Sequence, residues 1–485
     1  MRLAVLFSLL PAILATPISQ LAPLSSNGNI IDDQYIVVFK KGVDPANIAL
    51  HLDSIAESTL ASPLQGEEAG VTNVFTPQGI DYAGYAGRFS KETLELIRSS
   101  PDVAYVDHDQ IMTTTEVPQG VDDAFSGDDE LKTEIGAPWG LARISHRKEL
   151  RLGTFNKYTY DGSGGEGVTA YVIDTGININ HVEFQGRARW GKTIPRNDVD
   201  KDGNGHGTHC AGTVGSRKYG VAKGANLVAV KVLGSNGSGT MSDVIDGVLW
   251  AAQDAAKTAA AAARELALTG KTKHKGSVAN MSLGGGKAPS LDEAVDAAVE
   301  HGLHFAVAAG NDDADACKYS PAAAKGAITV GASTIGDDRA YFSNWGKCVD
   351  VFAPGLNILS TWNTGPESTN TISGTSMASP HICGLLAYLL SIEGHPTFTI
   401  NSDSVELVEQ EPSIYSQAYE LVPSWMKLVL PKPDETVELQ RVGDKKITTA
   451  QLKKALLALA TPGQLKDVGK GSPNLLAYNN ATSTK

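Results

Sequence analysis

The amino-acid sequence predicts an α/β fold, a mostly parallel sheet with helices on both faces, preceded by a small α+β domain. From about residue 137 onward, short apolar runs alternate with longer runs at helical spacing, which is typical of a parallel sheet covered by helices. Residues 34–112 instead hold short strands interleaved with two helices, which is typical of an α+β sandwich. Residues 113–136, between the two, are rich in glycine and carboxylates and therefore resist burial.

The N-terminal residues 1–15 are typical of a secretory signal peptide. Met1-Arg2 precedes an apolar run that is too short to span a bilayer. No later stretch of the sequence is both apolar enough and long enough for a membrane span. The net charge of −13 argues against a nucleic-acid partner. We therefore expect a protein that enters the secretory pathway, has no membrane span and binds no nucleic acid.

The predicted elements follow the two patterns in order. In the domain of residues 34–112, strands are expected at 35–39, 71–75 and 103–106, and helices at 46–58 and 92–98. The acidic linker of residues 113–136 is a natural place for cleavage. In the domain of residues 137–485, strands are expected at 168–174, 227–233, 277–282, 303–309 and 327–330, and helices at 241–268, 291–300 and 448–459.

A serine stands where one further helix is expected to begin. In Ser373-Gly374-Thr375-Ser376 the glycine permits a close approach of another backbone, and residues 382–390 continue as an apolar run at helical spacing. Ser376 would lie in the first turn, where free backbone N–H groups and the helix dipole favour negative charge on a nearby oxygen. A serine at a helix start is more often a simple N-cap, so a catalytic interpretation needs partners.

Two candidate partners lie upstream. A nucleophilic serine needs a base to take its proton and a third group that holds the base in the right tautomer. Asp174 ends the apolar strand 168–174, at the strand tip where functional groups of α/β sheets collect. His206 lies in a glycine-flanked helix start, Asn204-Gly205-His206-Gly207.

The chain order Asp174, His206, Ser376 and the flanking residues resemble the subtilisin-like serine proteases. The segments 137–146 and 341–359 resemble, more closely, the proteinase K branch and its fungal cerevisin (vacuolar protease B) group. This resemblance implies that Ser376 attacks a peptide carbonyl, His206 transfers the proton and Asp174 orients the imidazole. It also implies that the Asn311 side chain donates to the oxyanion.

The resemblance further implies how the chain is made and where it works. Residues 34–112 are similar to the inhibitory propeptide of these proteases, so we expect an inactive precursor that processes itself. The partners would be protein and peptide substrates and its own propeptide, and the enzyme would be a monomer, either vacuolar or secreted. Residues 393–446 exceed the length expected in the group and are predicted to be a surface insertion.

The substrate-binding residues follow from the same resemblance. The primary pocket would be walled by Ser282, Leu283, Gly284 and Gly285 on one side and by Ala308, Ala309 and Gly310 on the other. Ser235, Gly237 and Gly239 would belong to a strand edge that pairs with an extended substrate. The small side chains of these walls leave a wide apolar pocket, which predicts broad cleavage after large hydrophobic residues.

The cysteines and one aspartate carry structural expectations. Cys317 and Cys348 resemble the bridged pair of the cerevisin group, whereas Cys210 and Cys383 should stay free and buried. No cofactor is needed for the chemistry. Asp350 matches a calcium ligand of the proteinase K site, together with the carbonyl groups of Lys325 and Ala327, so a structural calcium ion is an expectation here.

Several competing motifs carry less weight. The phosphate-loop spacing at 186–193 is followed by proline and acidic residues in place of a helix, and the glycine motif at 162–167 precedes its strand. The aspartates of 198–203 resemble half a calcium loop but are interpreted as a solvated loop. A metal site at His206 and His209 or a Cys210 nucleophile is less favoured. A catalytically silent peptide-binding member remains the rival class, and the intact triad argues against it.

Overall fold

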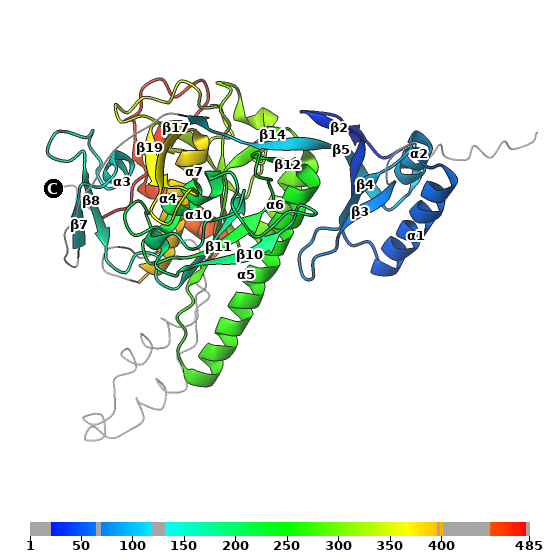
Figure 1. Ribbon diagram of the computed structural model, residues 1–485, viewed down its shortest axis with the longest axis horizontal. Coiled ribbons are helices and arrows are strands. Elements are labelled where there is room, and N and C mark those ends of the chain that lie inside the picture. Colours follow the sequence, from blue (N-terminus) through cyan, green and yellow to red (C-terminus); the bar gives the residue numbers. More distant parts are fainter. Residues whose placement is uncertain are drawn as a thin grey trace, which may run out of the picture.

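The computed structural model describes residues 21–64, 69–118, 131–394, 398, 400 and 447–481 (Figure 1). The predicted signal peptide at 1–15, most of the acidic linker and nearly all of the predicted insertion at 393–446 lie outside these residues. Two domains lie side by side, and one strand runs from the smaller domain into the larger one (Figure 1). No helix among the described residues is long and apolar enough to cross a membrane.

The smaller domain is an antiparallel sheet covered by two helices, as the sequence predicted. Its strands pair in the order β5-β2-β4-β3, and its helices pack on one face around buried Val37, Ile55 and Ile97. The two helices begin at side-chain caps, since Asp44 accepts from Ala46 N and Ser90 accepts from Thr93 N. The elements are β2 (Ile30–Phe39), α1 (Pro45–Ala61), β3 (Gly70–Phe75), β4 (Gly84–Arg88), α2 (Lys91–Ser99) and β5 (Val103–Thr114).

The larger domain is built on a nine-stranded sheet that is parallel except at one edge. The C-terminal hairpin supplies the antiparallel edge strand, and every other neighbouring pair is parallel. In spatial order the strands are β10 (Ala188–Thr193), β11 (Asn226–Lys231), β9 (Val168–Asp174), β13 (Gly276–Met281), β15 (His304–Ala308), β17 (Ile328–Ser333), β18 (Val351–Pro354), β22 (Leu475–Leu476) and β21 (Thr461–Pro462).

Helices cover both faces of this sheet because each central strand is apolar on both faces. In β9, Ala170 and Val172 face one core, and Tyr171 and Ile173 face the other, as the two-residue period of a strand requires. The first core holds α4 (His206–Gly215), α7 (Thr375–Ser391) and α10 (Thr449–Leu459), and the second holds α5 (Met241–Thr269) and α6 (Pro289–Glu300). The predicted α/β class is thus confirmed.

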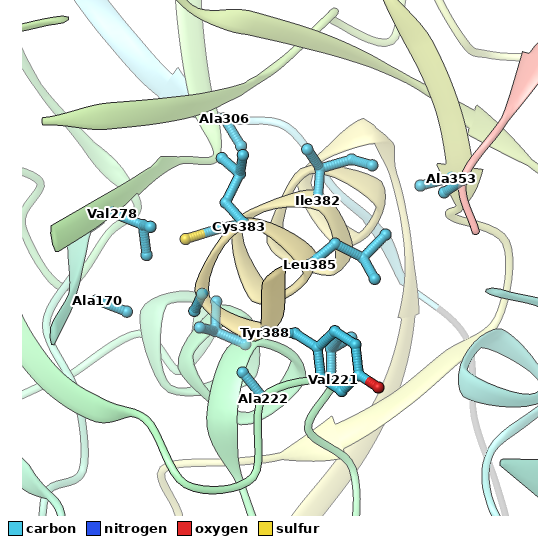
Figure 2. Packing of buried hydrophobic residues seen from close by; sticks show 14 of the residues in the cluster. Ala170, Val221, Ala222, Val278, Ala306, Ala353, Ile382, Cys383, Leu385 and Tyr388 are labelled. Carbon is cyan, nitrogen blue, oxygen red and sulfur yellow. The ribbon is translucent and has the colours of Figure 1, made fainter. Parts of the chain in front are cut away.

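Helix α7 is the centre of the first core. All of its residues are buried, and its side chains radiate toward the sheet and the neighbouring helix (Figure 2). Its small residues allow close packing: a Cβ on Gly384 would lie 2.6 Å from the Cβ of Val221. Cys383 lies in this core with a free thiol, as predicted.

Shorter elements complete the two domains. They include an antiparallel strand pair on the side of the larger domain opposite the smaller one, a short helix beside it, and the strands that border the candidate site (Figure 1). Their bounds are β1 (Leu24–Ser25), β6 (Val117–Pro118), β7 (Leu131–Ile135), α3 (Trp139–Ile144), β8 (Lys157–Asp161), η1 (Val182–Phe184), β12 (Ser238–Thr240), β14 (Leu283–Gly286), η2 (Ala316–Lys318), β16 (Tyr319–Ser320), β19 (Ile358–Thr361) and β20 (Thr369–Ser373).

Candidate active site

Asp174 and His206 form a buried pair at the carboxyl edge of the sheet. Asp174 is the last residue of β9, and His206 is the first residue of α4. Their Oδ1 and Nδ1 atoms are 2.8 Å apart, and both side chains are fully buried. Burial alone would lower the pKa of His206, but the charge of Asp174, with a smaller contribution from Cys210, raises the pKa well above its ordinary value.

Asp202 connects the two segments that carry this pair, and the sequence analysis missed it. Its side chain was predicted to lie in a solvated loop, yet the residue is only 3% exposed. Its carboxylate accepts from Thr175 Oγ1 at 2.9 Å, beside Asp174, and from Gly205 N at 2.8 Å and Thr208 N at 3.0 Å, around the first turn of α4. The solvated-loop prediction was therefore wrong for Asp202. Its position just before a glycine-flanked helix start is the signal that could have revealed a cap.

Ser376 lies in the first turn of α7, as predicted, but it makes no hydrogen bond to His206. Its Oγ donates to the carbonyl oxygen of Ser282 at 3.0 Å and also contacts Thr115 Oγ1. The Nε2 atom of His206 is buried and has no hydrogen-bond partner. Thr115, from the N-terminal segment, thus lies against the serine while the imidazole nitrogen that faces away from Asp174 stays unpaired.

The thiol of Cys210 lies close to both His206 and Ser376. Its Sγ atom lies 3.9 Å from His206 Nδ1 and 3.4 Å from the carbonyl oxygen of Ser376. Asp174, His206 and Cys210 offer potential ligand atoms within 4.8 Å of one another. However, Nδ1 is already hydrogen-bonded to Asp174, and burial raises the pKa of the Cys210 thiol, so a thiolate is disfavoured. The thiol is free and buried, as predicted.

His209 does not join His206 in a metal site. Its Nε2 atom contacts the carbonyl oxygens of Ile358 at 2.9 Å and Asn370 at 3.2 Å, so this nitrogen carries the proton. Burial lowers the pKa of His209 to about 3. A neutral imidazole that donates to backbone carbonyls anchors α4 against β19 and β20.

Asn311 has an unpaired side-chain amide close to Gly374. Its Oδ1 accepts from Thr375 N at 2.9 Å and Thr375 Oγ1 at 2.8 Å, which fixes the orientation of the side chain. The Nδ2 group is buried without a hydrogen-bond partner. A Cβ placed on Gly374 would lie 3.2 Å from this Nδ2 and 2.4 Å from the carbonyl oxygen of Thr115. A peptide carbonyl therefore passes close to Gly374 and near an amide that lacks an acceptor.

The N-terminal strand β5 crosses the site as an extended peptide. Thr113 pairs with Ser238 of β12 on one side and with Gly284 of β14 on the other, both antiparallel. Thr114 N donates to the carbonyl oxygen of Gly237 at 3.0 Å. Beyond the serine the chain continues as β6, which pairs with β20. Residues 113 and 114, predicted as linker, therefore belong to a paired strand.

A cavity of about 400 Å³ opens beside this strand. Of the predicted pocket residues, all but Ser282 line it; Ser282 instead contacts Ser376 through its carbonyl and its hydroxyl. Asp312 and Tyr319 also line the cavity, and the sequence analysis did not name them. The predicted residues that line it are Leu283, Gly284, Gly285, Ala308, Ala309 and Gly310.

The strand-edge residues are partly as expected. Gly237 and Gly239 border β5, since Gly239 pairs with Met112. Ser235 lies instead in the turn before β12, where its carbonyl oxygen accepts from Asn204 Nδ2 at 3.3 Å. The side chain of Ser235 is close to Gly203, on the loop that leads to α4.

Two predicted structural sites have opposite outcomes. Cys317 and Cys348 form a disulfide, as the resemblance implied. At Asp350 the expected oxygens do come together, but the ammonium group of Lys453 lies among them, 3.0 Å from Asp350 Oδ2. The residues present therefore do not fit a calcium ion at Asp350, because a lysine already takes the cation position.

The strand β5 also docks the smaller domain on two helices. Asp109 accepts from the Ser242 amide at 3.2 Å and hydroxyl at 2.6 Å, at the N-terminus of α5. Asp107 accepts from Ser290 N at 3.0 Å, in the first turn of α6. Carboxylates are favoured at helix N-termini, where backbone N–H groups are free and the dipole is positive.

Family models account for both domains. The model of the subtilase family matches residues 165–408, and the model of peptidase inhibitor I9 matches residues 34–115. The chain belongs to the subtilase family. It is a subtilisin-like serine endopeptidase of the Asp/His/Ser type with an I9 propeptide domain, and a catalytically silent role has no support.

Relatives agree along nearly the whole chain. "Alkaline protease 2" of Aspergillus fumigatus is 50% identical over 474 residues, which cover 95% of this chain and 83% of the relative. "Subtilisin-like serine protease Pen ch 18" of Penicillium rubens is 50% identical over 466 residues, with 93% and 81% covered. The crystal structure of a cold-adapted subtilisin-like serine proteinase is 40% identical, covers 71% of this chain and 98% of its own, and has a TM-score of 0.53.

Proposed function

We propose that Ser376, His206 and Asp174 are the catalytic triad of this subtilase. The observation that carries this assignment is the buried 2.8 Å pair of Asp174 and His206, whose second imidazole nitrogen is unpaired in a site shared with Ser376. Ser376 Oγ forms a bond to the peptide carbonyl carbon as its proton passes to His206 Nε2. The C–N bond then breaks, and the same proton goes to the leaving amine. Water then attacks the acyl-enzyme in the same way, with His206 as the base, which releases the acid product and restores Ser376.

Asn311 is the side-chain donor for the oxyanion in this proposal. Its orientation is fixed through Oδ1, so Nδ2 needs no reorganisation when charge develops on the substrate oxygen. The Ser376 backbone N–H, in the first turn of α7, is the second donor. Loss of one such donor costs about 3 to 4 kcal/mol of transition-state stabilisation, a magnitude measured on a subtilisin.

We infer that the precursor processes itself at the bond between Thr115 and Glu116. Three observations support this bond: β5 pairs on both sides up to Thr114, Thr115 Oγ1 contacts Ser376 Oγ, and the Thr115 carbonyl oxygen lies close to Gly374. The chain on the far side of the serine, β6, pairs separately with β20. The match to the I9 model also ends at residue 115.

The cleaved propeptide stays bound as an inhibitor in this scheme. It is already folded, so rebinding costs little conformational entropy. It keeps the strand pairing of β5 and the two carboxylate contacts of Asp107 and Asp109 at helix N-termini. Release therefore requires that these contacts be broken together or that the propeptide be digested.

Substrate preference and destination complete the proposal. The lining of the cavity by Leu283, Ala308 and Ala309 supports cleavage after large hydrophobic residues. The signal peptide predicted at 1–15 and the disulfide support passage through the oxidising secretory pathway. We propose secretion as the destination, since the comparisons do not support the vacuole, and a monomer as the working form.

Covalent labelling tests the triad assignment. The processed enzyme is treated with a fluorophosphonate and digested, and the modified peptide is identified by mass spectrometry. Modification at Ser376 is the expected result. Modification of another residue, or none in an active preparation, would contradict the assignment.

A further inference from the structure

Three oxygens, from Asp350 and the backbone carbonyls of Lys325 and Ala327, form a cluster around the ammonium group of Lys453. Lys453 Nζ donates to the carbonyl oxygen of Ala327 at 2.6 Å, to Asp350 Oδ2 at 3.0 Å and to the carbonyl oxygen of Lys325 at 3.2 Å. An ammonium group has three N–H donors and no acceptor. Three oxygens in hydrogen-bond range therefore satisfy it completely.

The position of Lys453 is fixed by its helix. On either side of it along α10, Leu452 and Leu456 are buried in the core that also holds α7. Asp350 is fixed as well, because its Oδ2 also accepts from Thr329 N at 2.9 Å. The lysine thus ties the starts of two neighbouring strands, β17 and β18, to a helix about one hundred residues later in the chain.

We propose that Lys453 replaces a structural calcium ion at Asp350, so that this cluster is a cation site filled by the chain. A calcium ion needs six to eight oxygen ligands at about 2.3–2.6 Å, and an ion among these three oxygens would lie against the ammonium group. The single positive charge of Lys453 pairs with the carboxylate of Asp350, and this cation is part of the chain and cannot dissociate. The junction of β17, β18 and α10 is then independent of free calcium.

The proposal predicts that removal of the lysine creates a calcium site. All variants are made in full-length Ser376→Ala protein, so that self-digestion does not disturb the measurement. The melting temperature is recorded in EDTA and in millimolar CaCl₂, and calcium binding is measured by titration calorimetry. In Lys453→Ala, the melting temperature should fall by several degrees in EDTA, and calcium should restore at least half of the loss.

Matched variants separate this site from any other calcium site. Lys454 is the exposed neighbour on the same helix, so Lys454→Ala should respond to calcium as the parent does. Adding Asp350→Asn to Lys453→Ala should abolish the new response. If Lys453→Ala does not fold, Lys453→Met keeps the apolar stem and takes its place.

Two results would overturn the proposal. The first is a calcium-dependent melting temperature in the parent that Asp350→Asn removes, since calcium would then bind beside the lysine. The second is a Lys453→Ala or Lys453→Met variant whose calcium response equals that of Lys454→Ala.

Discussion

Thr115 lies against Ser376, with the two side-chain oxygens in contact and the Thr115 carbonyl close to Gly374. The two residues are 261 positions apart in the chain. Strand pairing of β5 with β12 and β14 brings them together, so the propeptide strand lies where an extended substrate would lie. This contact is the basis of the proposed self-processing between Thr115 and Glu116.

Gly374→Ala should block maturation without unfolding the chain. The added Cβ would lie 2.4 Å from the carbonyl oxygen of Thr115, which excludes the peptide from its position beside Asn311. We expect at least a hundredfold slower conversion of precursor to mature enzyme on denaturing gels, because a small misplacement at a reacting centre costs about this much. Gly365→Ala is the control, since its Cβ would meet no atom within 4 Å. Equal conversion rates in the two variants would refute the close approach.

The pH dependence of activity should follow the raised pKa of His206. The imidazole must be neutral to accept the proton, so activity is present above its pKa and is lost as the pH falls through it. Because Asp174 raises that pKa, the acid limb of kcat/KM should have its midpoint above the ordinary histidine value of about 6.5.

Two other buried histidines do not interfere with this measurement. Burial lowers the pKa of His209 to about 3 and that of His381 to about 4, so both stay neutral in the relevant range. NMR titration of the His206 ring in the Ser376→Ala protein gives an independent value. A midpoint at or below 6.5 in both experiments would refute the predicted direction.

Asp202→Asn should lower kcat while KM changes little. The amide nitrogen of asparagine would face backbone and hydroxyl donors, so the link between Thr175 and the first turn of α4 weakens and His206 shifts. We expect a fall in kcat of roughly 10- to 100-fold. Asp200→Asn is the control, because Asp200 is exposed and accepts from Thr193 Oγ1 outside this network. An unchanged kcat in Asp202→Asn, or an equal loss in the control, would remove the positioning role.

Substrate libraries should reveal a preference for large hydrophobic residues before the cleaved bond. Small walls at Ala308 and Ala309 leave space for large side chains, and each additional buried methylene favours binding by about 1–3 kcal/mol. Asp312 lines the same cavity and is exposed, so Asp312→Asn should leave the hydrophobic ranking unchanged. A dominant preference for Lys or Arg that disappears in Asp312→Asn would contradict this expectation.

Local patterns in the sequence predicted the framework of the site because its elements are themselves local. An apolar run ending at Asp174 and glycine-flanked helix starts at His206 and Ser376 fix the strand tip and the two first turns. Strand β14 gave no such signal, since Leu283–Gly286 is mostly glycine and forms a strand by pairing with β5.

The misses depend on contacts between distant parts of the chain. Asp202 was assigned to a solvated loop because the aspartates of 198–203 complete only half of a calcium loop. Its buried donors come from both Thr175 and α4, which the local pattern does not show. Lys453 reaches Asp350 across 103 positions, so spacing could not reveal that a lysine takes the cation position. Such contacts depend on the tertiary fold and leave no periodic pattern.

The most direct test of the account is the mass and N-terminal sequence of the mature enzyme, with Ser376→Ala purified in parallel free of other proteases. The wild-type chain should begin at Glu116, beside a propeptide that ends at Thr115, and the variant should remain a precursor with that bond intact. A first mature N-terminus elsewhere within residues 113–136, or maturation of Ser376→Ala at the wild-type rate, would contradict self-processing at this bond.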